Sequence, residues 1–228
     1  MPLTNSQINR LGDRLRAAPA SDEDLRLLDE FQQEFTPALA ETRHLLEDAL
    51  TTVLGEGALR PTARVKQLRS IIEKLNRLPT RLVQLQDVVG LRAVVPNLAS
   101  QDAVVEALTS GPSWTVRDHS IDAPHGYRAV HAIHQAGRYR VEVQIRTPRQ
   151  QFWADLVEAM DRTVPGLKYG TAPADVQEMV AELGRSVAQV ETAESAADEQ
   201  ETKRLARQLM IGTAVTAVII WLRSRNTP

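Results

Sequence analysis

The chain of 228 residues contains no cysteine, so disulfide bonds and thiolate metal ligands are excluded. This composition suits a reducing compartment, and we expect a cytoplasmic protein. The N-terminus shows no basic start followed by an apolar run, which is the mark of a secretory signal. The formal net charge is -2, which excludes a general basic coat for nucleic acid but leaves room for a local basic patch.

An apolar run that would span a membrane comfortably is also missing. Residues 209–222 are uncharged, and Arg223 and Arg225 follow them. As a helix this segment would extend about 21 Å, whereas a bilayer core is about 30 Å thick. We therefore expect a C-terminal helix that packs on the body or on a second subunit. Two alternatives remain open: a short membrane-attached tail and a helix that binds a partner.

No glycine-rich phosphate loop is present, neither G-x-x-x-x-G-K-[ST] nor G-x-G-x-x-G at the start of a helix. Side chains must then recognise phosphate, and residues 60–92 offer many cations beside only two acids, Glu73 and Asp87. The cations are Arg60, Arg64, Lys66, Arg69, Lys74, Arg77, Arg81 and Arg92. Arg and Lys bind phosphate groups through forked and point-charge contacts, respectively. For this stretch alone, the alternative is a solvated basic face.

Apolar residues make up 43% of the chain, enough to build a core. Helical spacing predicts two helices within residues 22–54, interrupted at Pro37, and a third over residues 64–78 that Pro79 stops. Residues 88–95 are nearly all apolar and β-branched, which predicts a central strand. The other predicted elements are helices over 100–108, 150–160 and 173–209, the last with an acidic, solvated part over 191–202, and strands over 114–117, 129–134 and 140–147.

Two carboxylates stand beside predicted strands. Asp87 precedes the most apolar strand, and Glu142 lies on the polar face of the alternating strand 140–147, together with Gln144 and Arg146. A carboxylate next to a packed strand is costly unless something pairs with it. Mg²⁺ bridging nucleotide phosphates would do so, since it commonly takes one or two protein carboxylates. The alternative is a salt bridge, of Asp87 with Arg92 or of Glu142 with Arg146.

An aromatic residue enters the strand 129–134 from a loop marked by Pro124 and Gly126. Tyr127 and His131 share one face of this segment by the strand period. A tyrosine beside a histidine can stack on a purine and hydrogen-bond to it. The alternative is a tyrosine that caps the core beside a satisfied histidine. The spacing of the other histidines matches no metal site, and we interpret them as surface or packing residues.

Four motifs occur in one order: R-x-K-x-x-x-S-I-x-x-K from Arg64, D-x-x-G-x-R from Asp87, G-Y-R-x-x-H from Gly126 and E-x-Q-I-R-T from Glu142. Together they resemble the RelA/SpoT-type alarmone synthetase domain, over about residues 60–170. The resemblance implies an α+β fold with a mixed β-sheet of about five strands flanked by helices, nucleotidyltransferase-like, with helical N- and C-terminal extensions. The predicted division is an N-terminal helical region (1–58), the synthetase domain (59–170), a C-terminal helical region (171–208) and an apolar tail (209–228).

The resemblance implies transfer of the β,γ-pyrophosphate of ATP to the ribose 3′-hydroxyl of GDP or GTP, with release of AMP. It also implies a role for each matching residue. In the family's pattern, Arg64 and Arg92 sandwich the adenine, and Lys66, Ser70 and Lys74 hold the ATP phosphates. Asp87 binds Mg²⁺, and Glu142 assists the metal or the attacking hydroxyl. Tyr127 stacks on the acceptor base, and His131 and Gln144 lie near the acceptor.

The segment before Tyr127 departs from the family's pattern. The family usually has a lysine between prolines there, followed by asparagine, whereas this chain has Ile121-Asp122-Ala123-Pro124-His125, with Ala129 where serine is common. Toxin-like branches of the family modify other acceptors, so a pyrophosphokinase acting on the tRNA 3′ end or on an adenine nucleotide is the alternative. A second alternative is an inactive nucleotide-binding regulatory module. We also expect a homo-oligomer, while an antitoxin partner and a membrane contact belong to the alternatives.

Overall fold

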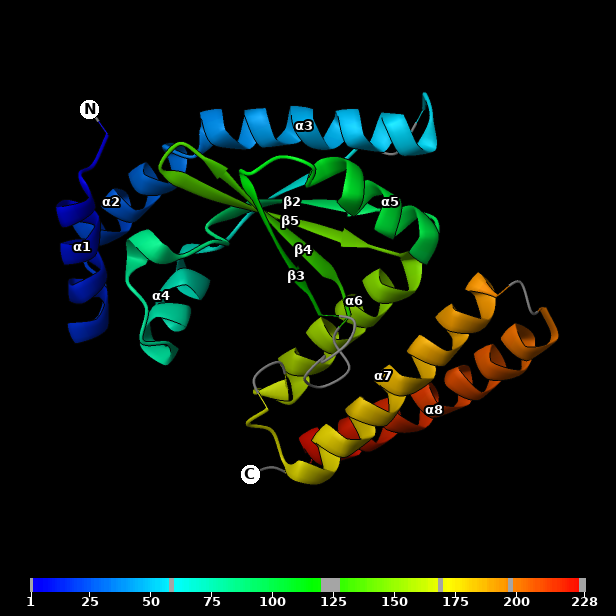
Figure 1. Cartoon of the computed structure of the whole chain (residues 1–228). Coiled ribbons are helices and arrows are strands. Elements are labelled where there is room, and N and C mark those ends of the chain that lie inside the picture. Colours follow the sequence, from blue (N-terminus) through cyan, green and yellow to red (C-terminus); the bar gives the residue numbers. More distant parts are fainter. Residues whose placement is uncertain (1, 58–59, 120–127, 168–169, 197–198, 226–228) are drawn as a thin grey trace. The chain divides into compact units, whose positions relative to one another are not determined.

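The computed structural model describes residues 2–57, 60–119, 128–167, 170–196 and 199–225, which form a five-stranded sheet with flanking helices (Figure 1). The strands are β1 (Thr62–Val65), β2 (Val89–Val94), β3 (Trp114–Asp118), β4 (Val130–Ala136) and β5 (Tyr139–Arg146), in the spatial order β1-β2-β5-β4-β3. The helices are α1 (Asn5–Ala17), α2 (Asp22–Gln33), α3 (Thr36–Leu54), α4 (Leu68–Arg77), α5 (Leu98–Leu108), α6 (Pro148–Thr163), α7 (Ala174–Ser195) and α8 (Glu199–Arg225), with a 3-10 turn η1 (Leu82–Gln84). The predicted α+β class, a mixed sheet flanked by helices, is confirmed.

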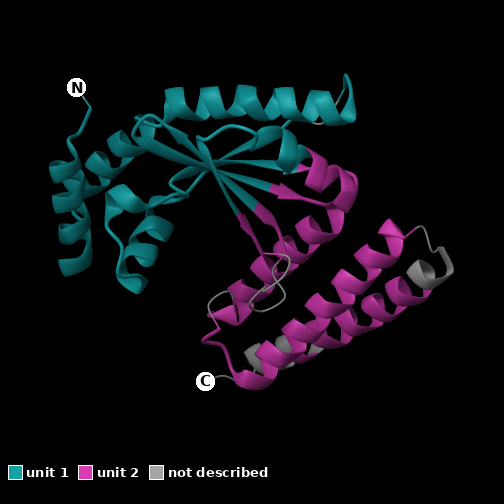
Figure 2. Cartoon of the chain, in the orientation of Figure 1, with its two compact units in different colours: residues 1–93, 104–116, 131–144 teal, residues 94–103, 117–130, 145–228 magenta. Residues whose placement is uncertain are grey.

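The chain divides into two compact units, each built from segments that are distant in sequence (Figure 2). Unit 1 comprises residues 1–93, 104–116 and 131–144, and unit 2 comprises residues 94–103, 117–130 and 145–228. Each unit has a hydrophobic core of its own. Apart from Tyr127, all the predicted site residues belong to unit 1.

The two helices predicted within residues 22–54 are confirmed as α2 and α3. Pro37 lies in the first turn of α3, where its missing N–H leaves no helical hydrogen bond unmade. Gly55 ends α3 with a φ of 83°, a backbone conformation that side chains with a Cβ disfavour. Sequence alone left α1 unassigned, although Thr4 begins it with a capping box.

The helix predicted over residues 64–78 is wrong at its N-terminal end. Residues 62–65 form the edge strand β1, which pairs antiparallel with β2, and α4 begins only at Leu68. Val65 lies three residues before Leu68 and so fits a helical stripe, yet it is 59% exposed. Pairing with β2 therefore overrides the local helical spacing, as tertiary context often does.

The central strand and the alternating strand are found where the sequence predicts them, as β2 and β5. In β5, Val141, Val143 and Ile145 are fully buried, as expected of the core-facing side. The polar side is also covered, since Gln144 and Arg146 are 5% and 3% exposed. Polar groups held away from water in this way need partners, so this side of β5 is not the solvated face of a surface strand.

In unit 2, the single helix predicted over residues 173–209 is wrong, because α7 ends at Ser195 and α8 begins at Glu199. No glycine or proline marks the break. The two helices instead lie side by side and bury apolar faces together with α6 (Figure 1). Packing between helices thus decides a boundary that propensity does not.

The apolar segment 209–222 is a continuous part of α8. Leu209 and Thr216 are buried, and Gly212 faces Leu183 of α7, so this segment packs on α7 as expected of a C-terminal helix. Other apolar side chains of α8 are exposed, namely Met210, Ile211 and Val215. Within the described part of the chain, no helix combines the length and the apolar character needed to cross a membrane.

Candidate functional site

Three predicted residues meet in what we call the lysine–aspartate cluster: Lys66, Lys74 and Asp87. Lys66 follows β1, Lys74 lies on α4, and Asp87 precedes β2. The Lys66 Nζ donates to Oδ2 of Asp87 at 2.7 Å, and the Lys74 Nζ lies 2.8 Å from Oδ1. All three side chains are at least three-quarters buried. The sequence alternative, a salt bridge of Asp87 with Arg92, is replaced by this pair of lysine contacts.

The cluster keeps Asp87 ionised. Burial raises the pKa of Asp87, but the charges and hydrogen bonds of Lys66 and Lys74 outweigh burial and lower the pKa from 3.8 to about 2. Two ammonium groups around one carboxylate leave a net positive charge. The cluster can therefore attract a phosphate group while it keeps a carboxylate available as an oxygen ligand.

Three further predicted residues form what we call the glutamate cluster: His131 on β4, and Glu142 and Gln144 on β5. His131 Nδ1 lies 3.1 Å from Oε1 of Glu142, and the Gln144 Nε2 donates to Oε2 at 2.8 Å. Burial raises the pKa of Glu142, but the hydrogen bond and charge of His131 and the Gln144 amide outweigh burial and hold the pKa below the usual glutamate value. An ionised, partnered carboxylate near neutral pH can accept a proton or bind a cation.

The two clusters act on each other through their charges. The negative charge of Asp87 raises the pKa of Glu142, although less than His131 and Gln144 lower it. Gly90, the glycine of the D-x-x-G-x-R motif, explains the close approach of β2 to β5. A Cβ placed on Gly90 would lie 2.5 Å from the carbonyl oxygen of Glu142, too close for any other residue without a shift of the backbone.

The two arginines predicted to hold adenine lie on one face of the β1–β2 pair. Arg64 is opposite Gly90, and Thr62 is opposite Arg92, so Arg64 and Arg92 occupy diagonal positions. Diagonal neighbours in an antiparallel pair are about 7–8 Å apart and lie within reach of long side chains. Guanidinium planes stack on aromatic rings, and this arrangement can accept a flat base between the two arginines.

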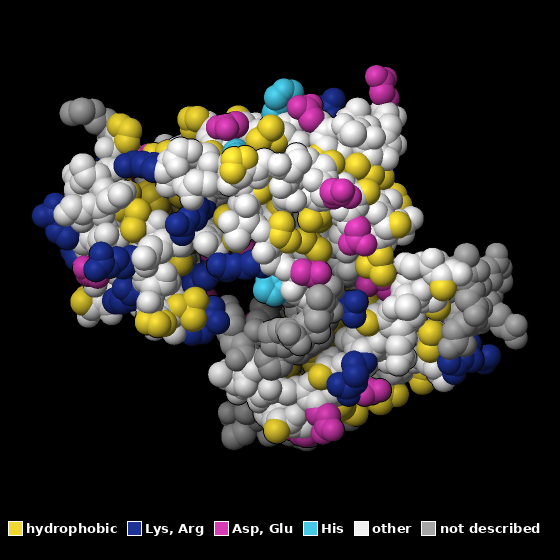
Figure 3. Space-filling view, in the orientation of Figure 1, with side chains coloured by type: hydrophobic (Ala, Val, Ile, Leu, Met, Phe, Trp, Pro, Cys, Tyr) yellow, Lys and Arg dark blue, Asp and Glu magenta, His cyan; other side chains and the backbone are white. Residues whose placement is uncertain are grey.

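Ser70 lies in the first turn of α4, four residues before Lys74, so both project from one side of the helix. Figure 3 shows Lys and Arg side chains gathered over part of unit 1. The exposed basic residues of the segment 60–81 are Arg60, Arg64, Arg69, Arg77 and Arg81. They are therefore distinct from Lys66 and Lys74, whose ammonium groups are turned inward to Asp87.

Tyr127 lies outside the described residues, and its role stays a prediction.

Asp87 and Glu142 are the residues that could hold a divalent cation. In the described ranges, no three His, Cys, Asp or Glu side chains gather as a metal site. Mg²⁺ does not require such a group, because it binds through one or two carboxylates and completes its shell with substrate phosphates and water. Asp87 and Glu142 are two ionised carboxylates, and the charge of Asp87 raises the pKa of Glu142. They can therefore supply the one or two carboxylate ligands that Mg²⁺ takes from a protein.

Sequence reasoning missed a buried carboxylate in unit 2. Glu191 of α7 falls in the stretch predicted to be acidic and solvated, but it is 3% exposed, so that prediction is wrong for this residue. Its carboxylate accepts a hydrogen bond from the Thr147 hydroxyl, lies 3.7 Å from Nε of Arg128, and receives a weak contact from Gln150. Thr147 ends the E-x-Q-I-R-T motif and Arg128 belongs to G-Y-R-x-x-H, so α7 ties two motifs together. The sequence did contain a signal for this burial: Glu191 follows the apolar Val187 by four residues, which places both on the same buried face of α7.

Replacing Glu191 by Ala should lower the free energy of unfolding by about 3 kcal/mol, because it leaves the partly buried Arg128 and the buried Thr147 without their partner. Chemical denaturation at neutral pH measures this. Glu194→Ala is the matched control, since its bond with Arg149 is more than a third exposed and typically contributes less than about 1 kcal/mol. Equal losses for the two variants would contradict the role assigned to Glu191.

Comparisons with known proteins agree with this fold. The family described as "Region found in RelA / SpoT proteins" matches residues 63–161. The uncharacterized protein Rv1366 of Mycobacterium tuberculosis is 30% identical over 198 residues, which cover 78% of this chain and 70% of that protein. The GTP pyrophosphokinase YjbM of Bacillus subtilis is 31% identical over 120 residues, 46% of this chain and 57% of that protein.

Among solved structures, small alarmone synthetase 1 from Bacillus subtilis, bound to its product pppGpp, superposes with a TM-score of 0.59 at 23% identity. The match covers 75% of this chain and 98% of that chain. The fold is thus that of the small alarmone synthetases. The family match over residues 63–161 and the similarity to Rv1366 over 78% of this chain show that the chain belongs to the RelA/SpoT family.

Proposed function

We propose that the chain is a pyrophosphokinase that transfers the β,γ-pyrophosphate of ATP to the ribose 3′-hydroxyl of GDP or GTP. One observation carries the proposal. Two ionised carboxylates lie in one compact unit: Asp87, which contacts two lysines, and Glu142, which contacts His131 and Gln144. The negative charge of Asp87 raises the pKa of Glu142. The similarity to a GTP pyrophosphokinase and to a synthetase with bound pppGpp supports the same conclusion.

In the proposed reaction, the 3′-oxygen of the acceptor attacks the β-phosphorus of ATP. The bond from that phosphorus to the oxygen bridging to the α-phosphate breaks, and AMP leaves with this oxygen. The hydroxyl proton passes to the Glu142 carboxylate and then to solvent, so GDP gives ppGpp and GTP gives pppGpp. Transfer of this kind depends mainly on positioning and on neutralising charge.

The residues divide this work between them. Lys66, Lys74 and Ser70 bind the donor phosphates, and the ammonium groups neutralise charge as the bond to the leaving group breaks. Asp87 and Glu142 would hold Mg²⁺, which supplies charge neutralisation at the phosphates when it is bound. The Gln144 Oε1 is buried and has no hydrogen-bond partner among the described residues, so it can accept a hydrogen bond from the acceptor.

A direct test is to incubate the protein with Mg²⁺ and ATP labelled at the γ-phosphate, offering GDP, GTP, ATP and tRNA in separate reactions. We expect label in ppGpp and pppGpp, with one AMP formed for each transfer. Label on tRNA or on an adenine nucleotide would instead establish the second candidate, which the missing lysine in residues 121–125 favours. Absence of label in every reaction, with nucleotide binding intact, would support the inactive regulatory module.

Tyr127 is predicted to stack on the acceptor base. Replacing it by Ala should raise the KM for the acceptor roughly tenfold and leave the KM for ATP nearly unchanged, because stacking on a base contributes about 1–3 kcal/mol. Tyr127→Phe keeps the ring and should have a mild effect. Initial-rate kinetics with each substrate varied in turn measure both constants. Equal changes in the two KM values would show instead that Tyr127 is a packing residue.

A further inference from the structure

A buried amide supports the lysine–aspartate cluster from the N-terminal helices. Gln32 of α2 is 7% exposed, and its Nε2 donates to the carbonyl oxygen of Lys66 at 2.6 Å and approaches that of Val88 at 3.5 Å. It stands on the buried face of α2 beside Leu28 and Phe31, where a polar side chain is costly unless it is bonded. The hydrogen bonds to these two carbonyl oxygens therefore compensate for the burial of the Gln32 amide.

The two carbonyl groups belong to the peptide segments that carry the cluster. The N–H of Lys66 donates to the Val88 carbonyl at 3.1 Å, which is the last bond of the β1–β2 ladder. After Lys66 the chain leaves the sheet and enters α4 at Leu68. Val88 directly follows Asp87. Gln32 thus bonds to the backbone on both sides of the ion pair between Lys66 and Asp87, at the place where the strand pairing ends.

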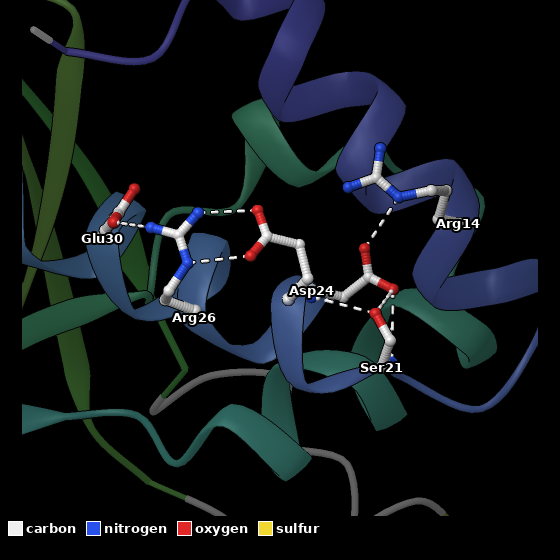
Figure 4. A network of polar contacts seen from close by, with 6 residues as sticks. Arg14, Ser21, Asp24, Arg26 and Glu30 are labelled. Carbon is white, nitrogen blue, oxygen red and sulfur yellow. Dashed lines mark hydrogen bonds and ion pairs between the residues drawn. The ribbon is translucent and has the colours of Figure 1, made fainter.

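Helix α2, which carries Gln32, is held in place by contacts near both of its ends. Ser21 accepts a hydrogen bond from the backbone N–H of Asp24 at the start of α2, and the Asp24 carboxylate receives Nε of Arg14 from α1 at 2.7 Å (Figure 4). Near the end of α2, Phe31 is buried in the core of unit 1, and so is Phe35 just after the helix; this core also contains apolar residues of α4 and Val88. The position of Gln32 is therefore fixed at both ends of its helix.

We infer that Gln32 is a positioning residue for the donor-phosphate site, since it fixes the backbone from which Lys66 and Asp87 project. The inference rests on the proposed function, because it takes the lysine–aspartate cluster as the part of the site that binds ATP. The glutamate cluster lies on β4 and β5, whereas within the described residues the Gln32 side chain bonds to the carbonyl oxygens of Lys66 and Val88. Its removal should consequently weaken ATP binding and spare the acceptor.

The test compares Gln32→Met with Gln33→Met. Methionine has nearly the length of glutamine and suits the apolar surroundings of Gln32, so the fold should survive the loss of the donor. Gln33 is exposed on the same helix, and its side chain donates to the Asp29 carboxylate on the surface, which makes it a matched control. With Gln32→Met we expect the KM for ATP to rise roughly tenfold and the KM for the acceptor to change less than about twofold. Gln33→Met should leave both constants at the wild-type values.

Hydrogen exchange of the protein without nucleotide provides a second readout. Backbone amides in residues 62–67 should exchange faster in Gln32→Met than in the wild type or in Gln33→Met, because the end of the β1–β2 ladder loses its support. Wild-type exchange over this segment overturns the inference, and so does an equal rise in both KM values. If the wild type transfers no pyrophosphate, the proposed function fails, whereas the exchange experiment still decides whether Gln32 fixes this backbone.

Discussion

Replacing Glu142 by Gln should lower kcat by on the order of 100-fold or more while the KM values change little. Glu142 is the carboxylate of the glutamate cluster, and its hydrogen bonds with His131 and Gln144 hold its pKa below the usual value, so it is ionised at neutral pH. Glutamine has the same shape but neither accepts the hydroxyl proton nor carries the charge that a cation needs. General-base catalysis typically contributes 10²–10⁴-fold, and steady-state kinetics at saturating ATP and acceptor measure the loss.

The fold should tolerate this substitution. A glutamine at position 142 can still accept a hydrogen bond from His131, and its amide can donate to Oε1 of Gln144 once the Gln144 amide, whose Nε2 faces Glu142 in the wild type, turns over. The melting temperature should therefore stay close to that of the wild type. Glu73→Gln, at an exposed position of α4, is the matched control and should keep full activity. Near-normal turnover of the Glu142 variant would mean that another group takes the proton.

The sequence predicted the fold where one hydrophobic pattern dominates. The apolar run of β2 and the alternation of β5 led to the right strands, and Pro37 and Gly55 marked the limits of α3. It failed at β1, because all the side chains of this edge strand are exposed and show no alternation. It also failed at the break between α7 and α8, where no residue type signals a turn. Both errors concern contacts with a distant segment, which local spacing does not contain.

For the candidate site, the sequence predicted which residues take part better than it predicted which of them form ion pairs with each other. Asp87 and Glu142 were expected to need partners, since carboxylates beside packed strands are costly when unpaired. From the sequence, the alternative partners were Arg92 for Asp87 and Arg146 for Glu142, each a few residues away. The structure instead gives Asp87 two lysines, from the end of β1 and from α4. Which cation reaches a carboxylate depends on strand register and helix placement, and these are set by the whole unit.

The residues that sequence reasoning missed share one signal. Gln32 and Glu191 each interrupt an apolar helical stripe, and each is buried and bonded to a site motif from outside the motif. A single polar residue on a buried helix face is a local conflict, and such conflicts tend to occur where function or specificity requires them. The sequence shows the conflict but cannot show which backbone or side chain resolves it.

Replacing Asp87 by Asn should abolish most of the activity and also destabilise the protein in a way that depends on pH. Asparagine cannot offer two charged oxygens to Lys66 and Lys74, and it cannot serve a cation as a carboxylate does. We expect kcat/KM for ATP to fall by on the order of 100-fold or more, as is usual when charge stabilisation at a reacting phosphate is removed. Asp102→Asn, at an exposed position of α5, should leave the activity unchanged.

The stability effect follows from the pKa of Asp87, which folding lowers from 3.8 to about 2. A depressed pKa means that the carboxylate stabilises the fold at pH values above about 4, where it is ionised in both states, and that this contribution is lost as the pH falls towards 2. The shift corresponds to about 2 kcal/mol at pH 7, of which about half should remain at pH 3. Denaturant unfolding of the wild type and Asp87→Asn at pH 7, 5, 4 and 3 should therefore give a difference that is constant down to about pH 5 and then shrinks. A difference that persists unchanged at pH 3, or that is absent at pH 7, would show that the two lysines do not hold Asp87 as described.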